Sequence, residues 1–92
     1  MPLYVAYMTF KEGTTTEQGM QAYLRRLTYT FPERATVLGE YWVNGSPQVV
    51  VVWEAEDEGP GDMIEAAWGD LFDVAVYPAS RPQLSGEPQI PT

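Results

Sequence analysis

The chain of 92 residues has room for one compact domain, because a second hydrophobic core does not fit into a chain of this length. Five basic and thirteen acidic side chains give a formal charge of −8, which argues against nucleic acids and anionic membranes as partners. No cysteine or histidine occurs, which excludes disulfides, thiolate nucleophiles, Cys/His metal sites and imidazole bases.

The first predicted element is a strand over residues 3–10, LYVAYMTF, with apolar residues on both parities, a pattern typical of a strand buried on both faces. This segment is too short for a signal peptide or a membrane span, so we expect a cytoplasmic protein. The threonines 14–16 with Glu17 then predict a capping box at the start of a helix. The helix has one apolar stripe, expected to face the core, which consists of Met20, Tyr23, Leu24, Leu27 and Phe31.

Residues 36–43 and 48–54 predict two strands joined at Asn44-Gly45-Ser46-Pro47, a strong hairpin signal. After an acidic loop, Asp62 is the predicted N-cap of a second helix, with Glu65 at the capping-box position. A short strand over 73–78 follows. Residues 80–92 contain three of the eight prolines and predict a tail that is flexible or draped on a partner subunit, leaving residues 1–79 as the domain.

The order β-α-β-β-α-β predicts the ferredoxin-like α+β fold, in which a four-stranded antiparallel sheet has two helices on one face. The other face measures roughly 450 Å² in projection, and the strands over 3–10 and 48–54 are apolar on both parities. We therefore expect a homodimer in which two sheets pack face to face.

Hairpin parity predicts which side chains share a face. The face expected to meet the partner carries Leu38, Glu40, Trp42, Val49, Val51 and Trp53, joined by Tyr4, Ala6, Met8, Phe10, Ala75 and Tyr77. The face expected beneath the helices carries Leu3, Val5, Val37, Gly39, Tyr41, Val43, Val50, Val52, Val74 and Val76.

Glu40 is the candidate catalytic residue, since a carboxylate between two indoles in a dry cavity has a raised pKa and can act as a general acid or base. Solvation at a barrel mouth is the alternative. Trp42 and Trp53 could stack a flat ligand or anchor the dimer. Tyr4 and Tyr77 could donate to a bound carbonyl or merely pack, and Met8 and Val51 complete this surface. The acidic loop over 54–62 is interpreted as a solvated charge run, so no metal and no cofactor is predicted.

Four segments carry a family resemblance: residues 4–14 (YVAYMTFKEGT), 36–42 (TVLGEYW), 50–57 (VVVWEAED) and 68–78 (WGDLFDVAVYP). They resemble a bacterial family of small single-domain proteins of unknown function within the dimeric α+β barrels. The resemblance implies a relation to cofactor-free monooxygenases of polycyclic aromatics, lactone isomerases and stress-responsive barrel proteins. The haem-degrading relatives use a histidine, which this sequence lacks.

The leading hypothesis is a homodimer that binds a small apolar or aromatic molecule in a cavity beside the sheet. Any catalysis would be of a cofactor-independent monooxygenase or isomerase type that uses a carboxylate. A non-enzymatic module whose acidic surface meets a basic partner, and a scaffold dimer without a cavity, are the alternatives.

Overall fold

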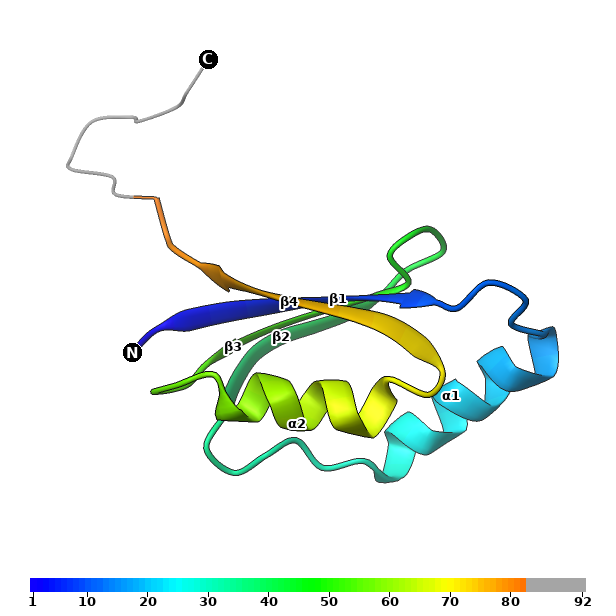
Figure 1. Cartoon of the computed structure of the whole chain (residues 1–92), viewed down its shortest axis with the longest axis horizontal. Helices are drawn as coiled ribbons and strands as arrows, with labels where there is room; N and C mark the ends of the chain where they lie inside the picture. Colours follow the sequence, from blue (N-terminus) through cyan, green and yellow to red (C-terminus); the bar gives the residue numbers. More distant parts are fainter. Residues whose placement is uncertain (83–92) are drawn as a thin grey trace, which may run out of the picture.

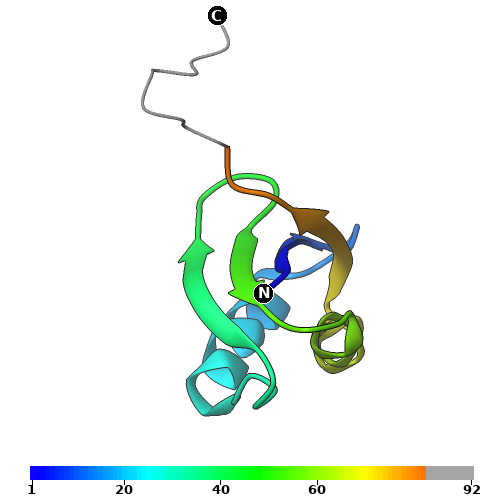
Figure 2. The same cartoon turned by 90° about the vertical axis from the view of Figure 1, so that its left-hand side faces the viewer.

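The computed structural model describes residues 1–82, and these form one four-stranded antiparallel sheet with two helices on one side (Figure 1). The elements are β1 (Leu3–Phe10), α1 (Thr16–Thr28), β2 (Thr36–Trp42), β3 (Val49–Glu54), α2 (Gly59–Trp68) and β4 (Phe72–Ala79). The strand order is β2-β3-β1-β4. The ferredoxin-like βαββαβ fold predicted from the sequence is therefore confirmed, and both helices lie beneath the same face of the curved sheet (Figure 2).

Strand β1 lies at the centre of the sheet and pairs antiparallel with β3 and with β4. The β2–β3 hairpin pairs Trp42 with Val49 and Glu40 with Val51, as hairpin parity predicts. A register shift between Val37 and Gly39 then removes Leu38 from the predicted set, because Val37 pairs with Trp53 in its place. A bulge moves every residue beyond it by one position, which parity alone does not reveal.

The predicted capping box of α1 exists, but one residue later in the chain. Thr15 is the N-cap: its Oγ1 accepts from the N–H of Gln18 at 3.1 Å, and Gln18 Oε1 accepts from the N–H of Thr15 at 2.9 Å. Thr14 cannot serve because its hydroxyl donates to the Lys11 carbonyl at 2.6 Å, within the turn after β1. Glutamine fills the N3 position of the box as well as glutamate does.

Helix α2 begins at Gly59, three residues before the predicted start at Asp62. Its N-cap residue is Glu58, which makes no side-chain capping bond, and the Asp57 carboxylate accepts from the Gly59 N–H at 2.9 Å. Pro60 lies in the first turn, where a missing N–H costs no helical hydrogen bond. Gly-Pro-Gly in isolation indicates a loop, which is why the sequence predicts a later start than the structure shows.

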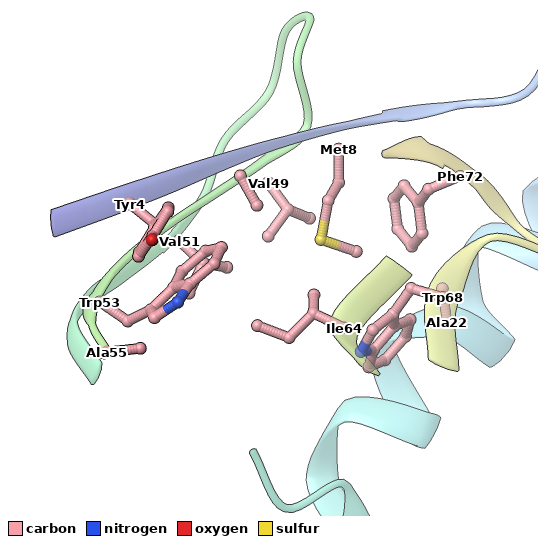
Figure 3. Packing of buried hydrophobic residues seen from close by; sticks show 11 residues of the cluster. Tyr4, Met8, Ala22, Val49, Val51, Trp53, Ala55, Ile64, Trp68 and Phe72 are labelled. Atoms are coloured by element: carbon pink, nitrogen blue, oxygen red, sulfur yellow. The ribbon is translucent and has the colours of Figure 1, made fainter. Parts of the chain in front are cut away.

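The core lies between the sheet and the helices, and it reverses the predicted faces of β1, β2 and β3 (Figure 3). The buried apolar residues are Tyr4, Ala6, Met8, Ala22, Val49, Val51, Trp53, Ala55, Ile64, Trp68 and Phe72. Within β1, β2 and β3, parity grouped the residues correctly apart from Leu38, but this set lies beneath the helices and does not face a partner. The sequence predicts Ala75 and Tyr77 of β4 on the same face as this set, but they lie on the opposite one. On β4 the faces are as predicted, since Val74 and Val76 pack against the core and Tyr77 is exposed.

The close approach of α2 to the sheet explains why the large side chains lie inside. A Cβ on Gly61 would lie 3.1 Å from Val76 Cγ1 and 3.3 Å from Trp53 Cζ2, so helix backbone occupies the space next to the sheet. Trp53 is completely buried and stacks on Tyr4 with ring centroids 6.0 Å apart. Among residues 1–82, its Nε1 is the one buried side-chain polar atom without a hydrogen-bond partner.

Four of the five residues in the predicted stripe of α1 face away from the core, which corrects the prediction, and Phe31, beyond the end of the helix, packs against the core. Met20, Tyr23, Leu24 and Leu27 are each more than half exposed. Ala22 is the one fully buried residue of this helix, and Gly19 faces the ring of Phe10. Helix α1 therefore approaches the sheet with small residues and with Arg26, while Arg25 reaches the end of α2 and the turn after it.

The open face of the sheet is apolar and is covered by no other described element. It carries Leu3, Val5, Tyr7, Tyr41, Val50, Val52, Ala75 and Tyr77. Tyr7 and Tyr77 lie with ring centroids 6.0 Å apart, and Tyr41 is 58% exposed. The expectation of a tail over 80–92 falls mostly on residues 83–92, which lie outside the described residues. Neither helix in the described part of the chain is long and apolar enough to cross a bilayer.

Candidate functional site

A shallow pocket of about 500 Å³, widely open to solvent, lies between α1 and the β2–β3 hairpin. Its lining consists of Phe10, Gly19, Tyr23, Trp42, Val43, Asn44, Gly45 and Gln48. The volume is in the range of small-molecule sites, and the lining combines aromatic rings with a few polar groups, as such sites do. Gly19 contributes to the opening because it places no side chain between α1 and the ring of Phe10.

Trp42, at the end of β2, is the aromatic centre of this pocket. Its ring packs edge to face with two other rings. Its centroid lies 5.7 Å from that of Tyr23 at an interplanar angle of 89°, and 6.2 Å from that of Phe72 at an angle of 83°. Its Nε1 donates a hydrogen bond to Glu40 Oε2 at 2.8 Å. The indole is thus fixed in orientation by packing on one side and by a charged acceptor on the other.

Glu40 is held in turn by Arg26 of α1. The Arg26 Nε lies 2.5 Å from Glu40 Oε2, and Nη2 lies 2.6 Å from Oε1, which makes a bidentate ion pair. The guanidinium also lies over the ring of Phe31 at 4.9 Å and donates from Nη1 to the Tyr29 carbonyl. The two side chains are 29% and 18% exposed, so the pair is largely shielded from water.

This environment overturns the predicted titration of Glu40. The hydrogen bonds from Arg26 are the largest influence and lower the pKa of Glu40, outweighing the effect of burial, and the hydrogen bond from Trp42 acts in the same direction. The raised pKa expected for a carboxylate between indoles is wrong, because the sequence did not reveal an arginine from α1 as its partner. Glu40 is therefore ionised near neutral pH and positions Trp42, and it is poorly suited to donate a proton.

The other predicted site residues lie in different places. Met8 and Val51 do meet Glu40 and Trp42, but the gap that they share measures only about 10 Å³ and cannot hold a ligand. Tyr4 and Trp53 pack together in the core (Figure 3), and neither lines the pocket. Tyr77 lies on the opposite face of the sheet. Of the predicted set, only Trp42 lines the pocket, with Glu40 directly behind it.

Sequence reasoning missed three residues of this region: Arg26, Tyr23 and Gln48. Arg26 could have been found as the cation that a half-buried Glu40 requires, had the correct face been assigned. Tyr23 was placed in the core-facing stripe of α1. Gln48 follows the turn of the hairpin and has no sequence signal that separates it from an ordinary polar strand residue.

The acidic loop contributes ion pairs and hydrogen bonds within the described residues. Asp57 forms an ion pair with Arg34 at 3.0 Å. The hydrogen bond from the Gly59 N–H is the largest influence that lowers the pKa of Asp57, and the hydrogen bond from Arg34 is the second. Within residues 1–82 there is no group of three or more acidic side chains that could hold a metal ion.

No curated protein and no solved structure matches the chain significantly. The relation to the dimeric α+β barrels stays a prediction. A family model does match, and it covers residues 2–86, which is nearly the whole sequence. The chain therefore belongs to the family described as Domain of unknown function (DUF3303).

Proposed function

We propose that this protein binds a small, uncharged aromatic molecule in the pocket between α1 and the β2–β3 hairpin. The observation that carries the proposal is the Trp42 ring, which lines a pocket of about 500 Å³ and is fixed by its hydrogen bond to Glu40. A ring whose orientation is set before binding loses little entropy when a flat ligand packs against it.

The charges around the pocket favour an uncharged ligand. No acidic or basic side chain lines it, and Arg26, which binds the Glu40 carboxylate behind Trp42, is already engaged by both oxygens of that carboxylate. The chain has a net charge of −8, which disfavours anions further. The site supports binding better than proton transfer, because the Glu40 carboxylate lies behind the indole and is held ionised.

The test uses the neutral fluorescent probe N-phenyl-1-naphthylamine, titrated into the protein at pH 7. We expect saturable binding that Trp42→Ala weakens at least tenfold, while Tyr41→Ser on the open sheet face leaves the dissociation constant unchanged. Trp42→Phe keeps a ring in place and is expected to retain most of the affinity, which separates loss of the site from loss of the fold. Equal affinity of the wild type and Trp42→Ala would contradict the proposal.

We infer, as a second proposal, that the open face of the sheet packs against the same face of a second copy. Three tyrosines support it, since Tyr7, Tyr41 and Tyr77 are 40%, 58% and 53% exposed on one apolar face. The face has a projected area of roughly 450 Å², a size that monomers also tolerate, so the exposed tyrosines and not the area carry this proposal. The charges on β3 and β4 are paired, Glu54 with Arg81 and Asp73 with Lys11.

Sedimentation tests the dimer. At micromolar concentration we expect a species of twice the 10.3 kDa chain mass, and Tyr7→Glu is expected to shift it to the monomer by burying a charge in the interface. Leu27→Glu, which places the same charge on the exposed stripe of α1, is the matched control and should remain dimeric. A wild type that sediments only as a monomer would refute the dimer.

A further inference from the structure

Gln48 is held at the wall of the pocket by hydrogen bonds to both neighbouring strands. Its backbone N–H donates to the Met8 carbonyl at 3.0 Å, and its carbonyl accepts from the Val43 N–H at 2.8 Å. Its side-chain Oε1 accepts from the Phe10 N–H at 2.8 Å. Main chain and side chain are therefore both fixed at the point where β1 ends and β3 begins.

The hydrogen bond from the Phe10 N–H also distinguishes the amide oxygen of Gln48 from its amide nitrogen. A backbone N–H can only donate, so the atom that faces it must be the amide oxygen and not the nitrogen. Nε2, with its two hydrogens, is consequently the end of Gln48 that remains for another partner. Within residues 1–82 this nitrogen donates to no other protein group, and Gln48 lines the pocket.

We propose that Gln48 Nε2 donates a hydrogen bond to an oxygen of the bound molecule, so that the preferred ligands are flat aromatic ketones or quinones. This inference rests on the proposed function, because it names the ligand class for the same pocket. The ring of such a ligand packs on Trp42 and Tyr23, and its carbonyl oxygen meets the amide hydrogens of Gln48.

The reason for the preference is the cost of covering an unpaired donor. A pure hydrocarbon that fills the pocket removes water from Nε2 and offers no acceptor in return, whereas a carbonyl of the same shape replaces that water. Sites built around a fixed polar group discriminate strongly for this reason. We expect a preference of about tenfold or more, which corresponds to about 1.4 kcal/mol.

The test compares 1-acetonaphthone with 1-ethylnaphthalene, which differ by a carbonyl in place of a methylene group. Each displaces N-phenyl-1-naphthylamine from the wild type, and the ketone should bind at least tenfold more tightly. Gln48→Glu keeps an oxygen for the Phe10 N–H but has no donor at pH 7. It should abolish the preference for the ketone, so that 1-acetonaphthone and 1-ethylnaphthalene bind this variant with dissociation constants within about twofold of each other.

Two further variants separate the donor from charge and from folding. Gln21→Glu makes the same change on an exposed part of α1 and should keep the ketone preference. Gln48→Met has a similar volume without polar atoms and should lose the preference without gaining a charge.

Three outcomes decide between the two proposals. Equal affinity of the wild type for both probes, or a ketone preference that survives in Gln48→Glu, overturns the role of Gln48 alone, provided that binding still depends on Trp42. Failure of both probes to bind in a manner that depends on Trp42 overturns the proposed function itself, and with it this inference.

Discussion

Helices α1 and α2 lie on the same side of the sheet but are held to it by different physical forces. Helix α2 buries Ile64 and Trp68 almost completely and brings Pro60 and Gly61 against the strands. Helix α1 buries only Ala22. Its attachment depends on Arg26 at Glu40 and on Arg25, whose guanidinium binds both oxygens of Asp70 at 2.9 Å.

One helix layer therefore combines attachment by apolar burial, in α2, with attachment by ion pairs, in α1. Apolar burial is neither screened by salt nor lost by protonation, so α2 is expected to stay in place over a wide range of conditions. Ion pairs weaken as the salt concentration rises and as their carboxylates are protonated, so the attachment of α1 depends on ionic strength and pH. Because α1 is one wall of the pocket, the shape of the pocket depends on the weaker of the two attachments.

The largest expected effect is the loss of a side chain between α2 and the sheet. Ile64→Ala removes a fully buried side chain and should lower the free energy of unfolding by about 3 kcal/mol, measured by urea denaturation. Met63→Ala, on the exposed side of the same helix, is the control and should change it by less than about 0.5 kcal/mol. Similar losses for both variants would show that α2 is not held by burial.

Glu40→Gln tests the attachment of α1 and has an intermediate effect. The variant leaves the Arg26 guanidinium half-buried without its counter-charge, so we expect a loss of about 2 kcal/mol at pH 7. Arg25→Met is the comparison, since its partner Asp70 is 61% exposed and the pair should contribute less than about 1 kcal/mol. If both variants lowered the free energy of unfolding equally, the result would contradict the view that the Arg26–Glu40 pair contributes more than the exposed Arg25–Asp70 pair.

The same variant has a defined pH dependence. The pKa of Glu40 is lower in the folded chain than its usual value of 4.5, so the unfolded chain binds more protons and stability rises with pH in that interval. The contribution of the pair is complete above the unfolded pKa and is lost as the pH falls through the folded value. The stability difference between wild type and Glu40→Gln should therefore shrink with acidification below about pH 4.5. A difference that stayed constant down to the acid limit of folding would contradict the lowered pKa.

The smallest expected effect concerns the exposed stripe of α1. Leu27 is 69% exposed, so Leu27→Gln should leave the free energy of unfolding within about 0.5 kcal/mol of the wild type. A loss above 1 kcal/mol at high protein concentration, absent on dilution, would show that another molecule covers the stripe. In that case the contrast between the helices would hold only for the isolated chain.

The sequence was sufficient for the order of the elements, because hydrophobic period and turn residues are local signals. The pairing of Trp42 with Val49 followed from the hairpin alone. The direction in which that set of residues points did not, since it depends on the helix layer. Gly61 and Ala22 bring the backbones of the two helices close to the sheet, so the large side chains of the sheet fill the space between sheet and helices. A glycine or an alanine in a sequence does not by itself predict such a close approach. Arg26 and Glu40, fourteen positions apart, meet only after folding.

The buried Trp53 Nε1 has a consequence for protein engineering. Within residues 1–82 no protein acceptor faces this N–H, and a buried indole N–H is stabilised when an acceptor pairs with it. What position 53 requires is a broad flat surface against Tyr4 and the backbone of Gly61, and the nitrogen contributes nothing to that requirement. The interior of this small domain is therefore open to improvement, and an acceptor placed opposite that nitrogen is the change most suited to making a thermostable form.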